Sequence, residues 1–298
     1  MAPSTIRTQH GFTLVEAIVV MVVLGIIGAT IGMFITGPLR GAVDLGARVE
    51  LTDSADTAIR RLERDVRNAL PNSLRITSVG SAVYLEYLDV RTAGRYRTVA
   101  SGGASNAASC PDTNLNGLAD EDVLDFTGAD TCFRSTGTLP NFATIVANTD
   151  YMVLFNLGAG ISGSNAYEFA GTGGNKSLIT ATAVAAANEN RISFTSIAFP
   201  FASPGSRFHV VSGPVTYQCD PVAGQLRRLS GYAISTAQGT PPATPTANTL
   251  VANNISACAF VYTSSANERA GVLASTLSLT RNAETVTLHH ETPISNAP

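Results

Sequence analysis

The chain has 298 residues, a formal net charge of −3 and 45% hydrophobic residues, with only 14% charged residues and no tryptophan. This near-neutral charge provides no basic surface for a phosphate backbone, so we expect no nucleic-acid partner. The length allows one large domain or two small ones.

An apolar run near the N-terminus contains a single charged residue, Glu16, between Phe12 and Ile35. A helix of that length rises about 36 Å, which is enough to cross a hydrocarbon core of roughly 30 Å. A soluble core helix is rarely apolar on every face over such a length. We therefore predict a membrane-spanning helix over residues 12–36, preceded by a leader at residues 1–11.

The residues flanking this run predict its orientation. Arg7 and the amino terminus precede it, and basic residues are retained on the cytoplasmic side, so everything after Arg40 should be extracytoplasmic. A cleaved secretory signal is disfavoured, because its apolar region spans only about 7 to 15 residues. We expect a single-pass inner-membrane protein with a periplasmic head.

Glu16 is energetically costly where it stands. An acidic side chain at mid-membrane costs about 2.5 to 3.5 kcal/mol and less near an interface. The positive end of the helix dipole returns only about 0.3 to 1 kcal/mol. Glu16 therefore either finds a partner or lies solvated among the headgroups.

A second helical pattern follows at residues 37–71. Gly37 and Pro38 can bend a helix without ending it, and Pro71 should stop it. Apolar residues recur at steps of three and four, which predicts an amphipathic continuation that packs on the head. The stripe comprises Leu51, Ala55, Ile59, Leu62, Val66, Ala69 and Leu70.

Charged residues occupy the other side of this second pattern. We predict ion pairs four residues apart, between Arg61 and Asp65 and between Glu63 and Arg67. The arginine cluster is best interpreted as a solvated, salt-bridged face.

Residues 72–298 have the pattern of a β-rich head. A long helix followed by strands predicts an α+β fold, with an antiparallel sheet covered on one face. Small polar segments at 100–109, 158–177 and 234–254 are expected to form long surface loops. The expected strands are 74–79, 82–88, 95–100, 151–157, 191–197, 206–212, 214–219, 225–230, 257–263, 272–280 and 284–291.

Four cysteines lie in the predicted extracytoplasmic head, where disulfides persist. Four cysteines allow three pairings, and proximity along the chain favours Cys110 with Cys132 and Cys219 with Cys258. Their spacing does not match a zinc site.

The stretch DTNLNGLADED, residues 112–122, resembles the calcium loops of EF-hand and thrombospondin-type repeats. Gly117 permits a sharp turn, but Val123 stands where an EF-hand has its bidentate glutamate, so Glu121, Asp122 or Asp125 would have to substitute. An Asp/Asn-rich turn without an ion explains the pattern equally well, and calcium is the only cofactor we consider. The candidate ligands are Asp112, Asn114, Asn116, Leu118 and Asp120.

Other motifs give no indication of catalysis, and we do not expect an enzyme. GTGGNKS, residues 171–177, lacks the glycine that a phosphate loop has before its lysine, and we interpret it as a flexible loop. His289 and His290 should point to opposite faces of a strand, and no recognisable nucleophile motif accompanies them.

GFTLVEAIVVMVVLGIIG, residues 11–28, resembles the processing and assembly motif of type IV prepilins and pseudopilins. The resemblance implies that a prepilin peptidase cuts between Gly11 and Phe12 and methylates the new amine of Phe12. It also implies that Glu16 pairs with the N-terminal amine of a neighbouring subunit, and that the chain has a pilin-like fold.

Three further stretches, residues 60–76, 83–97 and 286–298, resemble minor pseudopilins of the mannose-sensitive haemagglutinin (MSHA) pilus, and more distantly those of type II secretion. This resemblance implies a minor subunit that helps initiate or cap a filament, acts in assembly and not in catalysis, and is located at the pilus tip. Its partners would be other major and minor pilins, the prepilin peptidase and the inner-membrane assembly platform. A tip adhesin and a type II secretion pseudopilin are the alternatives.

Overall fold

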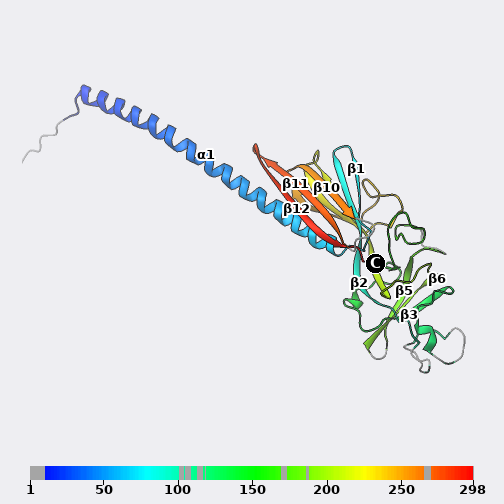
Figure 1. The fold of residues 1–298 in the computed structure, drawn as a ribbon. Helices are drawn as coiled ribbons and strands as arrows, with labels where there is room; N and C mark the ends of the chain where they lie inside the picture. Colours follow the sequence, from blue (N-terminus) through cyan, green and yellow to red (C-terminus); the bar gives the residue numbers. More distant parts are fainter. Residues whose placement is uncertain are drawn as a thin grey trace, which may run out of the picture.

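The computed structural model describes residues 11–100, 104, 109–112, 117, 119–168, 173–185, 188–264 and 270–297, with residues 35–44, 119, 120 and 264 described by their backbone. A single long helix, α1 (Leu14–Arg67), leads into a β-rich head (Figure 1). The helix has 54 residues and is about 80 Å long. The predicted α+β, pilin-like fold is confirmed.

The helix α1 passes through Gly37 and Pro38 without ending, as predicted. It ends at Arg67, four residues before Pro71. The chain leaves the helix here because its backbone joins the sheet: the Leu70 N–H donates to the carbonyl of Leu88 at 2.8 Å.

Two antiparallel sheets form the head. The larger has nine strands in the order β1-β2-β7-β4-β5-β6-β3, with β8 paired to β7 and β9 paired to β8, and the smaller has the order β10-β11-β12. Two short 3-10 helices, η1 (Ala119–Asp122) and η2 (Phe142–Thr144), lie in the connections. The strands are β1 (Arg75–Val79), β2 (Ala82–Arg95), β3 (Asp130–Arg134), β4 (Tyr151–Leu154), β5 (Lys176–Ala185), β6 (Glu189–Ile197), β7 (Arg207–Asp220), β8 (Gln225–Ser230), β9 (Ala247–Asn253), β10 (Ile255–Ser264), β11 (Ala270–Arg281) and β12 (Glu284–Ser295).

Several strand predictions were wrong. Strands β3, β5 and β9 were not predicted, and β5 and β9 begin or lie within segments expected to be loops. Strands β5 and β9 contain β-branched residues such as Ile179 and Val251, but they adjoin or lie within segments rich in Gly, Ser, Asn and Pro, which favour loops. Segment 95–100, predicted as a strand, contributes beyond β2 only an isolated bridge between Tyr96 and Ser135. Segments 206–212 and 214–219 belong to one strand, β7.

The predicted amphipathic stripe is confirmed, because all seven of its residues are buried. This half of α1 lies along β11 and β12 of the smaller sheet (Figure 1). The smaller sheet alternates as predicted, so its inner residues Leu273, Leu277 and Leu279 join the helix in one core. Tyr87 of β2 and Tyr217 of β7 close that core from the larger sheet.

The centre of the larger sheet is covered on both faces, contrary to the prediction of one covered face. Consecutive residues of β2 from Tyr84 to Leu88 are all buried. The second face is covered partly by the 158–177 segment, where Ala166 and Tyr167 pack with Leu88. This segment is therefore not a surface loop throughout.

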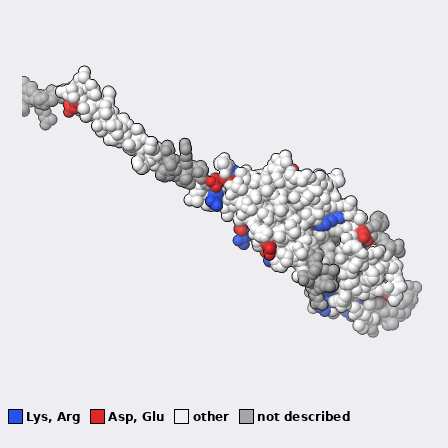
Figure 2. All heavy atoms as spheres, turned by 45° about the horizontal axis from the view of Figure 1, so that its top comes forward, with Lys and Arg blue, Asp and Glu red and all other residues white. Residues whose placement is uncertain are grey.

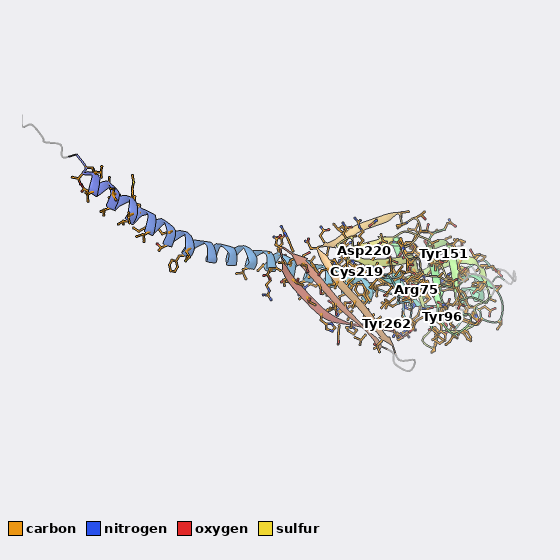
Figure 3. The ribbon with its side chains drawn as sticks, turned by 90° about the horizontal axis from the view of Figure 1, so that it is seen from above. Arg75, Tyr96, Tyr151, Cys219, Asp220 and Tyr262 are labelled. Carbon is orange, nitrogen blue, oxygen red and sulfur yellow. A yellow bond between two sulfur atoms is a disulfide. The ribbon has the colours of Figure 1, made fainter. Side chains whose placement is uncertain are left out.

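The expected cysteine pairing is confirmed in both bonds. Cys219 of β7 bonds Cys258 of β10 and links the two sheets, and Cys110 bonds Cys132 of β3. Figure 3 labels Cys219 in the half of the head nearer the helix, whereas Tyr96 and Tyr151 lie farther from it. Around Tyr96, the far half contains a separate aromatic core with Phe133, Phe194 and Phe208.

Asp65 connects the helix to the larger sheet. Its Oδ2 accepts hydrogen bonds from the Tyr217 hydroxyl at 2.9 Å and from the Arg228 Nε at 2.7 Å. The predicted pair of Asp65 with Arg61 was therefore wrong, because the sheet supplies closer donors, whereas the pair of Glu63 with Arg67 is present at 2.5 Å. Burial and the Asp65 charge raise the pKa of Tyr217, so its hydroxyl stays protonated and donates.

We expect Asp65→Ala to lower the free energy of unfolding by about 1 to 3 kcal/mol, because it leaves the Tyr217 hydroxyl and Arg228 without their acceptor. Asp56→Ala is the matched control, since its pair with Arg60 lies on the exposed face of the same helix, where solvent screens it, and its loss should change stability far less. Urea unfolding of the full chain in detergent micelles measures both. Equal losses in the two variants would contradict this role for Asp65.

Candidate functional site

The start of α1 has a defined capping geometry. Thr13 is extended, with φ −73° and ψ 151°, and its hydroxyl accepts a hydrogen bond from the Glu16 backbone N–H at 3.3 Å. Thr13 and Glu16 stand three residues apart, which is the spacing of a capping box. Thr13 was not predicted as the N-cap of this helix, although the Thr-x-x-Glu pattern indicates one.

The backbone and the side chain of Glu16 are free to act separately. The backbone N–H completes the cap, whereas the side chain is exposed in the first turn. A carboxylate in the first turn also interacts favourably with the positive end of the helix dipole. The cap orders the backbone between Phe12 and Glu16. It therefore sets how far the Glu16 carboxylate lies from Phe12, the two residues of the predicted contact between subunits.

Gly11 and Phe12 precede the cap in an exposed, non-helical stretch. A Cβ added at Gly11 would meet no atom of the described residues within 4 Å. Phe12 is 78% exposed in the part of the chain that the structure describes. Both residues are accessible to another protein.

From Leu14 to Phe34, α1 has a mean hydropathy of 2.6 and none of its residues is buried. Figure 2 shows this part of the helix as a largely uncharged rod, with charged side chains gathered where the helix enters the head. The length and composition suffice to cross a membrane. Such an exposed apolar surface requires cover from lipid or from other proteins.

Two exposed apolar side chains also lie beyond the predicted membrane span, where the structure again describes side chains. Leu45 is 64% exposed and Val49 is 62% exposed. They lie about 16 and 22 Å beyond Phe34 along the helix axis, on consecutive turns. The hydrocarbon core that covers Leu14–Phe34 would not reach them.

We expect Thr13→Ala to weaken the start of α1 by about 1 kcal/mol, because the Glu16 N–H loses its acceptor. Hydrogen exchange at the Glu16 amide, measured in micelles, should become about fivefold faster. Thr30→Ala is the control, since that hydroxyl bonds carbonyls in the middle of the helix and leaves the cap intact. Unchanged exchange at Glu16 in Thr13→Ala would contradict the capping geometry.

The calcium-like loop lies mostly outside the described residues: Asn114, Asn116 and Leu118 are not described, and Asp120 is described by its backbone in η1. Gly117 makes the expected turn, with φ +76°, and its N–H donates to Asp112 Oδ2 at 2.7 Å. Among the described residues, no group of three or more His, Cys, Asp or Glu side chains is placed to hold a metal ion.

Two of the carboxylates considered as substitute ligands are already bound within the chain. Asp122 is fully buried and accepts hydrogen bonds from the Cys110 N–H at 2.7 Å and from Arg134 at 2.8 Å. Asp125 accepts from the Thr127 N–H and hydroxyl, and these bonds lower its pKa. Asp122 thus fits a structural role beside the Cys110–Cys132 disulfide better than calcium ligation.

The GTGGNKS motif does not form a phosphate loop in its described residues, but its end is not a flexible loop either. Lys176 and Ser177 begin strand β5 and both are buried. They line a cavity of about 580 Å³ over β4, β5 and β6, far from α1. Sequence analysis missed this cavity, because residues from five separate segments form it.

The two adjacent histidines point to opposite faces of β12, as predicted. His290 faces the helix, with its Nε2 3.2 Å from the Glu63 carboxylate, whereas His289 lies on the outer face beside Thr276. His209 of β7 is half-buried, and burial, with a smaller contribution from the Arg207 charge, lowers its pKa to about 4.

His209 should make the head less stable in acid. Its folded pKa of about 4 lies below its ordinary value of 6.5, so the native state binds fewer protons than the unfolded state between these pH values. Unfolding midpoints should therefore fall as pH is lowered from 6.5 to 4, and less steeply in His209→Gln. The exposed His289→Gln is the control and should keep the wild-type slope. A wild-type slope in His209→Gln would contradict the buried, neutral histidine.

Comparison with protein families identifies the Prokaryotic N-terminal methylation motif at residues 6–32. The matched range contains Gly11, Phe12 and Glu16 and most of the apolar segment. Comparison with curated proteins and with solved structures found no significant match. With the long helix and the antiparallel head, the motif supports a type IV pilin- or pseudopilin-like protein, and the segment Leu14–Phe34 fits a single-pass membrane anchor.

Proposed function

We propose that this pilin-like chain is a minor pseudopilin, a structural subunit that helps initiate or cap a type IV pilus of the MSHA type. The observation that carries the proposal is the uncovered apolar surface of α1 over Leu14–Phe34, which begins beside a carboxylate, together with the exposed Leu45 and Val49 beyond the membrane span. A membrane anchor alone needs only the segment that lies in lipid. Leu45 and Val49 need cover from protein, which neighbouring helices in a filament would supply.

Processing would create the second half of the assembly contact. We propose that a prepilin peptidase cuts between Gly11 and Phe12 and methylates the amine of Phe12, leaving the Thr13 cap in place. The amine of Phe12 and the carboxylate of Glu16 would then lie at the same end of the helix with opposite charges. In water-poor surroundings such charges are stable only when paired, which favours a contact between adjacent subunits.

The structure of the head favours a position at the tip of the filament over a repeated position in its shaft. It contains two sheets and three hydrophobic clusters, with the long segment 231–246 packed on it through Ser235, Thr236 and Gln238. A subunit at the tip has no neighbour above it, so its head is free of the packing limits that a shaft subunit meets. A type II secretion pseudopilin of the same class is the alternative assignment, and the partner subunits would be other pilins and the inner-membrane assembly platform.

The proposed role is structural and not catalytic. Calcium binding at the loop of Asp112, Asn114, Asn116, Leu118 and Asp120 stays a prediction, and the bonds that already engage Asp122 count against one of its substitute ligands. The disulfides Cys110–Cys132 and Cys219–Cys258 fit a periplasmic head.

The first test is Glu16→Ala. Processing should continue, because Gly11 and Phe12 are unchanged, but incorporation into filaments should fall at least tenfold, because the Phe12 amine loses its partner. Intact mass gives processing, with methylated Phe12 as the expected first residue, and immunoblotting of sheared filaments gives incorporation. Glu50→Ala is the control on the same helix, because its carboxylate pairs with Arg281 of its own chain. Normal incorporation of Glu16→Ala would overturn the proposed contact.

A further inference from the structure

We propose that the cavity over β4, β5 and β6 binds a hydroxylated carboxylic acid of monosaccharide size, such as a uronic acid. The cavity has a volume of about 580 Å³, within the range of small-molecule sites. It lies in the half of the head far from α1, which the assembly contact leaves uncovered (Figure 1). This inference goes beyond the structural role proposed above and does not depend on it.

Lys176 supplies the charge that such an acid needs. It is the only lysine in the sequence, and the other 18 of the 19 basic residues are arginines. Only 5% of Lys176 is exposed, and its Nζ donates to the carbonyls of Ala166 at 2.7 Å and Glu168 at 2.5 Å. An ammonium group has three donors, so one remains available.

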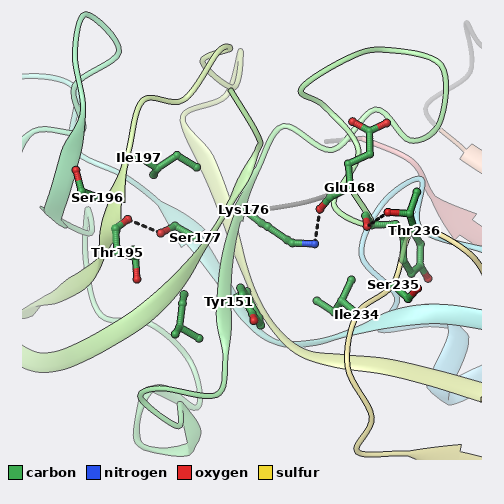
Figure 4. Close-up of a pocket in the computed structure, with 12 residues that line it drawn as sticks. Tyr151, Glu168, Lys176, Ser177, Thr195, Ser196, Ile197, Ile234, Ser235 and Thr236 are labelled. Carbon is green, nitrogen blue, oxygen red and sulfur yellow. Dashed lines mark hydrogen bonds between the residues drawn. The ribbon is translucent and has the colours of Figure 1, made fainter. Parts of the chain in front are cut away.

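No carboxylate neutralises this ammonium among the described residues. The Glu168 carboxylate is turned away from Lys176, and only its backbone carbonyl approaches the Nζ (Figure 4). Burial lowers the pKa of Lys176 to about 8, and the Glu168 charge offsets this only in part. A buried charge without a counter-ion is costly, and a ligand carboxylate would relieve that cost.

The remaining walls fit the body of a sugar better than a simple anion. Hydroxyl and aliphatic side chains occur on both sides of the cavity, on residues 195–197 of β6 and on residues 234–236 opposite (Figure 4). The ring of Tyr151 lies 6.0 Å from the Lys176 Nζ. A hydroxyl has one donor and can also accept. The Ser177 and Thr236 hydroxyls already donate to the carbonyls of Thr195 and Tyr167, so these two can accept from ligand hydroxyls. The lining hydroxyls are those of Ser177, Thr195, Ser196, Ser235 and Thr236.

The cavity is already formed without a ligand, because Arg75 of β1 holds two of its walls. The Arg75 guanidinium lies 3.6 Å from the centre of the Tyr167 ring and donates to the carbonyls of Ser235 and Thr236 at 2.9 and 2.7 Å. It is held in turn by the buried Glu86. The Thr236 hydroxyl also donates to the Tyr167 carbonyl at 3.3 Å, which joins the two walls directly. A preformed site binds with less ordering cost.

A structural role for Lys176 is the competing explanation, since the same ammonium holds the carbonyls of the 166–168 segment. The two explanations differ in whether a ligand binds, and in whether blocking the cavity abolishes that binding. A purely structural lysine predicts no ligand at all. A ligand site predicts that a bulky residue at the rim abolishes binding while the lysine stays in place.

The test is calorimetry on the full chain in micelles, titrated with D-glucuronate, D-glucose and acetate. We expect binding of glucuronate, with at least tenfold weaker binding of glucose, which lacks the carboxylate, and of acetate, which lacks the hydroxyls. Equal binding of acetate, or no binding of glucuronate, overturns the proposal. A p-nitrophenyl glucuronide then separates the sources: its binding identifies the end of a glycan chain, and binding of glucuronate alone identifies the free acid.

Variants distinguish the site from a general effect on folding. Thr195→Trp fills the rim of the cavity and should abolish glucuronate binding, whereas Thr263→Trp, on the exposed face of β10, should leave it unchanged. Affinity should fall about 30-fold between pH 7 and 9.5 as the ammonium loses its proton. Glucuronate should also slow acetylation of Lys176, which peptide mass mapping reads directly because no other lysine is present. Binding that survives Thr195→Trp would place the ligand elsewhere and overturn the proposal.

Discussion

The first half of α1 has an apolar surface that nothing in the described part of its own chain covers, and the organisation of the molecule follows from this constraint. Hydrophobic surface of that extent is not stable in water, so the segment belongs in lipid or against other helices. The second half of the same helix has the opposite arrangement, because the head buries its apolar stripe. One helix therefore joins an intermolecular surface to an intramolecular core.

The head is fixed to the helix by several kinds of contact. Apolar side chains of α1, β11 and β12 fill the core, and Asp65 connects the helix to β7 and β8 through Tyr217 and Arg228. Strand β7 is central, because it pairs with β2, β4 and β8 and bonds the smaller sheet through Cys219. Movement of the helix is thus coupled to the sheet that also supports the far half of the head.

The two candidate sites lie at opposite ends of the molecule and use different chemistry. At the start of α1, a carboxylate stands in an apolar surface, which suits association with a cationic partner in water-poor surroundings. At the far end of the head, a buried ammonium stands among hydroxyls and aromatic rings, which suits a small polar ligand. This separation allows assembly and ligand binding to proceed without competing for one surface.

The sequence by itself determined the long helix, its membrane-length apolar half, its amphipathic half and the N-terminal motif around Gly11, Phe12 and Glu16. These features depend on periodicity and spacing within one continuous segment, so local pattern is sufficient to find them. The cysteine pairing favoured by chain proximity was also correct.

Only the tertiary structure decided the features that depend on distant segments. Strands β5 and β9 begin or lie within segments whose Gly, Ser, Asn and Pro residues favour loops, and pairing with neighbouring strands defines them as strands. Asp65 pairs with Arg228, because the fold brings the Nε of this distant residue to 2.7 Å from its carboxylate; the predicted partner, Arg61, lies one turn along the same helix. Lys176 looked like part of a flexible loop, and its burial in a cavity became visible only when five segments came together around it, since sequence spacing carries no information on such contacts.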